Sequence, residues 1–93
     1  MATNKLKDIN NVEIKVGNEV YWNDPAINDL ETREERKEAW LTIWKVDEID
    51  EENEMVCIST EYSEAEVYPK ELEVAIYIRK PDEYEFYVEN QII

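Results

Sequence analysis

The sequence predicts a small, mainly β fold. Short runs in which apolar and polar residues alternate recur along its 93 residues, and turn-forming residues separate them. The chain is 43% hydrophobic, with three Trp and six Tyr, so it can build a core despite a net charge of −14. A chain of this length supports one modest core, and we expect residues 1–93 to form a single domain.

The first predicted strand covers residues 19–22. It follows a turn at Gly17, because glycine adopts backbone angles that other residues avoid. Alternation along the strand directs Val20 and Trp22 to one face and Tyr21 to the other. We therefore expect Tyr21 to face outward.

A short helix is predicted over residues 33–40. Thr32 and Glu35 have the spacing of a capping box, in which each side chain satisfies a backbone N–H group at the start of a helix. The first two turns are charged, so the helix offers few apolar residues for packing. It is expected to be the one helix of the fold, in an insert between the first and second strands.

A central hairpin is predicted from residues 41–49 and 54–60. Both segments alternate, and pairing them places four side chains on a shared face: Trp44, Val46, Val56 and Ile58. Six of the eight residues from 47 to 54 are acidic. This connection lacks glycine, so Asn53 is predicted to take a left-handed turn conformation.

Three further strands are predicted over residues 64–68, 74–79 and 83–89. Pro69 begins a compact corner between the first two. The last segment alternates acidic with apolar residues, as in an extra edge strand that pairs with the rest of the fold or forms a homodimer with a second copy. The predicted core has six large members: Trp22, Val46, Val56, Ile58, Val67 and Ile76.

Composition excludes several classes of function. The chain has no His and one Cys, so the usual zinc sites and histidine-activated nucleophiles cannot form. Its single glycine excludes glycine-rich phosphate-binding loops, and the acidic run 47–54 lacks the glycine and the spacing of an EF-hand. Cys57 is interpreted as a small hydrophobic residue of a strand. We predict a protein that is not an enzyme and holds no metal or cofactor.

The distribution of charge is the main indication of function. Residues 1–46 carry nine acids and seven bases, whereas residues 47–93 carry fifteen acids and three bases. This asymmetry predicts a negative face that attracts a basic protein partner. Direct nucleic-acid binding is disfavoured, because phosphate contacts require clustered Lys and Arg. No run has the length of a signal peptide or a membrane span, so a cytoplasmic location without a membrane partner is expected.

The predicted elements resemble a Src homology 3-like small barrel over roughly residues 13–79. The resemblance rests on residues 16–22 as a first strand, the insert in place of a long first loop, the central hairpin, and residues 66–73 as strand, single turn and last strand. The chain is also similar to short uncharacterised barrel proteins carried by bacterial mobile elements. The barrel family includes readers of peptides and modules of transcription and the ribosome, so the resemblance implies a binding role. The tyrosine-rich acidic motif of its proline-peptide readers is not recognisable here.

These observations favour a non-catalytic protein-binding module; the alternative is a nucleic-acid mimic that inhibits a DNA- or RNA-binding protein. A mimic would carry a continuous band of carboxylates, and a module would show a groove. The aromatic candidates for binding a partner's Lys or Arg are Tyr21, Trp40, Trp44, Tyr62, Tyr68 and Tyr77. Both Trp40 and Trp44 fit either the core or a ligand-facing surface. The predicted partner-binding residues are Tyr21, Tyr62, Tyr68, Asp50, Glu51, Glu52, Glu54, Glu64 and Glu66.

Overall fold

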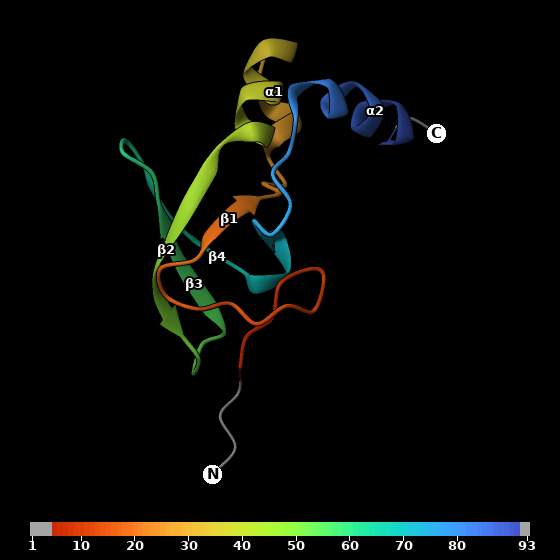
Figure 1. The fold of residues 1–93 in the computed structure, drawn as a ribbon. Coiled ribbons are helices and arrows are strands. Elements are labelled where there is room, and N and C mark those ends of the chain that lie inside the picture. Colours follow the sequence, from red (N-terminus) through yellow and green to blue (C-terminus); the bar gives the residue numbers. More distant parts are fainter. Residues whose placement is uncertain (1–4, 92–93) are drawn as a thin grey trace.

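The computed structural model describes residues 5–91, and its main feature is a five-stranded antiparallel sheet (Figure 1). The strands are β1 (Glu19–Trp22), β2 (Ile43–Asp50), β3 (Met55–Ser59), β4 (Glu64–Val67) and β5 (Leu72–Val74). Their order across the sheet is β4-β3-β2-β1-β5, so β4 and β5 form its edges. The predicted mainly β fold and its central hairpin are confirmed.

Two α-helices, α1 (Arg33–Leu41) and α2 (Pro81–Gln91), lie together at one end of the sheet (Figure 1). The predicted start of α1 is confirmed: the Glu35 N–H donates to Thr32 Oγ1 at 3.1 Å, and Thr32 Oγ1 donates to Glu35 Oε1 at 3.1 Å. An exposed ion pair between Arg33 and Glu85 connects the two helices.

Helix α2 replaces the extra strand predicted over residues 83–89, so that prediction is wrong. Pro81 stands at the first helical position, where its missing N–H costs nothing, and Asp82 and Glu83 suit the positive end of the helix dipole. Glu83 also accepts a hydrogen bond from the Lys80 N–H at 2.7 Å. These signals outweigh the alternating pattern, and the predicted homodimer has no strand here through which to pair.

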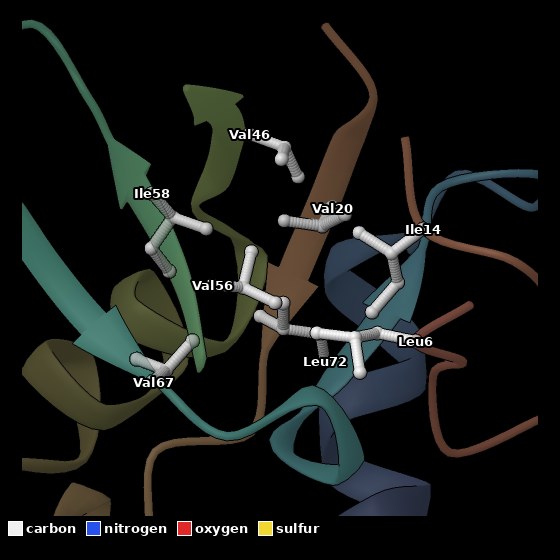
Figure 2. Packing of buried hydrophobic residues seen from close by; sticks show 8 residues of the cluster. All are labelled: Leu6, Ile14, Val20, Val46, Val56, Ile58, Val67 and Leu72. Carbon is white, nitrogen blue, oxygen red and sulfur yellow. The ribbon is translucent and has the colours of Figure 1, made fainter. Parts of the chain in front are cut away.

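The hydrophobic core lies against one face of the sheet, where eight buried side chains converge (Figure 2). They are Leu6, Ile14, Val20, Val46, Val56, Ile58, Val67 and Leu72. The core prediction is confirmed for Val46, Val56, Ile58 and Val67, and Trp22 is partly buried against them.

Ile76 was expected in the core, but it is 76% exposed. Strand β5 ends at Val74, well before residue 79, and the Ile76 N–H donates to the Val74 carbonyl at 2.7 Å. This tight turn takes the chain out of the sheet. The prediction of a strand over 74–79 is therefore wrong beyond its first residue.

A β-bulge at Asp47 keeps β2 in phase with the core. Val46 pairs with Ile58 and Glu48 pairs with Cys57, so Asp47 is an extra residue. Strict alternation would turn Glu48 inward after Val46. The extra residue instead leaves Asp47 and Glu48 exposed and lets Ile49 pack against the core.

The β2–β3 connection turns at a different residue from the one expected. The left-handed conformation belongs to Glu54, with φ 56°, and the prediction for Asn53 is wrong. Asn53 instead donates its backbone N–H to Asp50 Oδ1 at 3.1 Å and its side-chain amide to Asp50 Oδ2 at 2.8 Å. The turn predicted at Gly17 is confirmed by its φ of 93°.

The segment before β1 covers the outer edge of β5. The Ile9 N–H donates to the Leu72 carbonyl at 2.9 Å. The side chain of Asp8 is fully buried. Its carboxylate accepts backbone N–H bonds at 2.8, 2.8 and 2.7 Å, respectively from Asn10, Val12 and Val74. These contacts seal one of the two edges of the sheet.

Candidate binding groove

A groove of about 510 Å³ opens where β2 begins and β3 ends. This volume lies within the range of pockets that hold small ligands or side chains. The lining residues that give the groove its character are Trp22, Asp24, Ile43, Trp44, Glu61 and Tyr62. They come from β1 and the residues that directly follow it, from β2 and from the β3–β4 turn, which the sheet brings together.

Two tryptophan rings form the wall of the groove. Val20 pairs with Trp44, and Trp22 lies two residues further along the same face of β1. The two rings meet edge to face, with centroids 5.3 Å apart and planes at 87°. Trp22 Nε1 donates to Glu71 Oε1 at 3.0 Å, which fixes the orientation of its ring. The wall is therefore preorganised.

The rim of the groove is a short turn that presents Tyr62. Thr60 Oγ1 accepts the backbone N–H bonds of Tyr62 at 3.2 Å and of Ser63 at 3.1 Å. The Thr60 N–H donates to the Ser63 carbonyl at 2.8 Å. Tyr62 is 89% exposed, which confirms its predicted outward orientation. The turn holds a large aromatic surface in solvent beside the groove.

The charge of the groove is negative. Asp24 and Glu61 line it, and none of its described lining residues is a Lys or Arg. Asp24 Oδ1 accepts the Ala26 N–H at 2.9 Å, which holds this carboxylate in place. Carboxylates beside aromatic faces form a favourable environment for a cation.

The predicted partner-binding residues do not form one site. The hairpin-tip acids and the groove lie at opposite ends of β3, whose five residues span roughly 16 Å. Tyr68 is 60% exposed, as predicted, but it lines a separate hollow of about 560 Å³, which it shares with the tip acid Glu54 and three lysines. The residues of the tip are Asp50, Glu51, Glu52 and Glu54, and the lysines are Lys5, Lys7 and Lys70.

Tyr21 is only 1% exposed, so the prediction that it faces outward is wrong. The Arg79 guanidinium carbon lies 4.4 Å from the centre of the Tyr21 ring and 4.6 Å from that of Trp40. The guanidinium also donates to the Trp40 carbonyl at 2.9 Å, to Asn23 Oδ1 at 2.8 Å and to Glu73 Oε1 at 2.8 Å. The cation bound by these two aromatic residues is therefore the chain's own.

The two tryptophans that fitted either role are now placed. Trp40 is buried and packs against Tyr84, with ring centroids 5.6 Å apart, so it belongs to the interior. Trp44 packs against the core on one side and lines the groove on the other. Trp22, Asp24 and Glu61 also line the groove, although the sequence did not single them out as candidate binding residues. The sequence feature that could have indicated the wall is that Trp22 and Trp44 fall on the same face of two paired strands.

Tyr77 lies outside the groove and interacts with α2. Its hydroxyl donates to Glu83 Oε2 at 2.9 Å, and this hydrogen bond raises the pKa of Tyr77. The pKa of Glu83 is lowered, first by the hydrogen bond from the Lys80 N–H and then by the one from Tyr77. Tyr77 thus helps, through its hydrogen bond to Glu83, to hold the start of α2.

A third, acidic hollow of about 360 Å³ lies on the outer face of the sheet. The register places Cys57 between Glu48 and Glu66, and Asp47 and Glu64 also line the hollow. The pKa of the Cys57 thiol is raised, first by burial and then by the negative charges of Glu66 and Glu48. The thiol is thus held in its unreactive protonated form.

We expect a Glu48→Gln, Glu66→Gln double variant to be alkylated at Cys57 about threefold faster than the parent protein at mildly alkaline pH. Removing the two charges lowers the thiol pKa and increases the thiolate fraction. Iodoacetamide labelling followed by mass spectrometry measures the rate. The control is Glu34→Gln, Glu38→Gln, which removes equal charge from α1. Equal acceleration in the control would contradict the local electrostatic explanation.

The raised thiol pKa also determines the direction in which Cys57 changes the free energy of unfolding as the pH rises. The folded protein holds this proton more tightly than the unfolded chain. The contribution of Cys57 is therefore constant below the ordinary thiol pKa and becomes destabilising as the pH rises through it.

Comparison of the chain with family models, with curated proteins and with solved structures gives no match. Within residues 5–91, no group of three or more Cys, Asp or Glu side chains is placed to hold a metal ion. Over the same residues, neither helix is long and apolar enough to cross a membrane.

Proposed function

We propose that this chain is a non-catalytic module that binds a basic segment of a protein partner. The observation that carries the proposal is the groove: a preorganised pair of tryptophan rings with an exposed tyrosine and two carboxylates at its rim. A Lys or Arg side chain has the complementary chemistry. Its aliphatic stem packs along Trp44 and Ile43, and its cationic head lies near Asp24 and Glu61.

The acids outside the groove contribute to the encounter with this partner. Nine of the fifteen acids of residues 47–93 lie within residues 47–66, on the hairpin, the β3–β4 turn and β4, and they give this part of the molecule a field that attracts basic surfaces over several ångströms. Such a field raises the association rate and weakens as salt is added. The hairpin-tip acids act through this field, because they lie too far from the groove to touch the same side chain.

The proposal includes a Src homology 3-like arrangement of the sheet. Its support is the strand order, in which β1 pairs with both β2 and β5, and the single 3-10 turn Pro69–Glu71 that joins β4 to β5. The insert that carries α1 occupies the place of the long first loop. Within this arrangement the groove lies beside that insert.

The alternative, a nucleic-acid mimic, has less support. Two carboxylates, Glu64 and Glu66, lie on one side of β4 with a spacing of about 6 to 7 Å, as a phosphate rail requires. The row of paired residues that contains Glu64 runs across the sheet as Glu19, Lys45, Ser59 and Glu64, so a positive charge and a serine stand between its two carboxylates. The band of carboxylates is therefore interrupted, whereas the groove has a defined shape.

The test is a titration with a short synthetic peptide in which lysine alternates with valine. The three Trp indole N–H signals are separate NMR reporters. We expect those of Trp22 and Trp44 to shift on binding and that of Trp40, which is buried elsewhere, to stay in place. A Glu61→Gln, Tyr62→Ala variant should bind about tenfold more weakly, and added salt should release the peptide.

The matched control is Asp29→Asn, Ile78→Ala, which also removes one charge and one exposed large side chain, both outside the groove and outside β4. It should leave the affinity within about twofold of the parent. Equal losses in the two variants, or binding that leaves the Trp44 signal unmoved, would show that the groove is not the binding site.

A further inference from the structure

The two edges of the sheet are treated differently by the chain. At β5, the Ile9 N–H pairs with the Leu72 carbonyl, and Asp8 accepts the Val74 N–H. At β4, the only strand partner is β3, and within residues 5–91 no backbone hydrogen bond reaches the opposite side of β4. An open edge is a template on which another strand can add.

The two faces of β4 specify what such a strand must carry. Glu64 and Glu66 are exposed on the outer face, where Glu66 lies in register with Cys57 and Glu48. Ala65 and Val67 turn toward the core. A strand added here places alternate side chains over the carboxylates and the others beside Ala65, so it must alternate Lys or Arg with apolar residues.

The charge on β4 also excludes a second copy of this chain as the natural occupant. Pairing two β4 edges would bring Glu64 and Glu66 of both copies close together, and like charges opposite each other destabilise a strand pair. The same acids that prevent self-association attract a basic strand.

The edge is continuous with the groove. Residues 60–63 form the rim of the groove, and β4 begins at Glu64. An extended segment that lies along β4 therefore reaches the rim at the β3–β4 turn without leaving the sheet. One basic segment can use both surfaces.

We infer that the partner binds by strand addition: an extended segment, with Lys or Arg at every second position, joins the sheet as a sixth strand along β4. This inference rests on the proposed function for the basic character of the partner. It adds the backbone geometry and the sequence pattern that the partner must have.

The experiment uses the lysine–valine peptide and a copy in which the backbone nitrogens on one edge are methylated, which blocks strand pairing and keeps every charge. We expect the methylated peptide, with methyl groups placed on the pairing edge, to bind at least about tenfold more weakly. The unmodified peptide should slow the hydrogen exchange of amides in β4. A Glu64→Gln, Glu66→Gln variant should also lose about tenfold in affinity.

The matched control removes two charges from α1, by Glu34→Gln, Glu38→Gln, and should change the affinity by less than about twofold.

Strand addition is overturned if the methylated peptide binds as tightly as the parent peptide. In that case, shifts of the Trp44 signal still support the groove. Protection of β4 without any Trp44 shift supports strand addition and contradicts the groove. Peptide-independent protection of β4, with a doubled mass in solution, would assign the edge to a second copy and overturn the inference.

Discussion

Replacing Arg79 by alanine is expected to lower the free energy of unfolding by about 3 kcal/mol or more. Its guanidinium side chain is only 9% exposed and contacts Tyr21, Trp40, Asn23 and Glu73. Truncation leaves three acceptors without their donor and removes the cation from two aromatic faces. A domain of this size gains only about 5 to 15 kcal/mol on folding, so the loss is a large fraction of its stability.

Thermal unfolding followed by circular dichroism measures the effect, and the melting temperature should fall by more than about 10 °C. The matched control is Lys80→Ala, which removes the same charge from the neighbouring exposed residue and should shift the melting temperature by only about 3 °C or less. Arg79→Lys should be intermediate, because one ammonium group cannot satisfy three acceptors on different elements. Similar melting temperatures for Arg79→Ala and Lys80→Ala would contradict a structural role for the guanidinium.

Replacing Asp8 by alanine is expected to cost about 3 to 5 kcal/mol. The carboxylate is fully buried and accepts three backbone hydrogen bonds, including one from Val74 that closes the β5 edge. Without it, these three N–H groups lose their acceptor at the contact between the N-terminal segment and β5. Leu6 and Ile14, on the same segment, then lose their fixed position in the core.

Urea unfolding gives the loss of stability, and hydrogen exchange of the Val74 amide gives its location. The Val74 amide should lose its protection more than amides of β3, because the N-terminal segment leaves β5 before the sheet opens. Asp29→Ala is the control, since Asp29 is exposed, and it should be nearly neutral. Unchanged protection of Val74 in the Asp8 variant would show that the carboxylate is not what holds this edge.

Features set by neighbouring residues were predictable from the sequence. The capping residues Thr32 and Glu35 gave the start of α1, Gly17 gave the turn before β1, and alternation gave the shared face of the central hairpin. Each depends on residues a few positions apart. The sequence predicted that a binding module would have a groove, but not which residues line it, because the wall and rim come from three segments that are distant in the sequence.

The wrong predictions have two causes, contacts between distant residues and conflicting local signals. Tyr21 is covered by Arg79, which is 58 positions away, and no local pattern announces that contact. The segment around Ile76 has the composition of a strand. The turn after Val74 nevertheless leads the chain out of the sheet, toward Arg79 and its partners. For α2 the local signals were in conflict, and Pro81 with its following acids outweighed the alternation.

The position of β1 between β2 and β5 has a consequence for the order of assembly during synthesis. The hairpin of β2 and β3, with β4 beside it, contains only short-range pairings, and these can form as soon as residue 67 has emerged. Strand β1 is made first, but its second partner, β5, is made more than fifty residues later. Until then Val20, Leu6 and Ile14 lack the Leu72 side chain that covers them.

Closure of this side of the sheet is thus a late, long-range step, and long-range steps set the pace of folding. One side of β1 therefore stays unpaired until residues 72–74 are made, and in this interval the acids of the hairpin and β4 repel neighbouring copies of the chain.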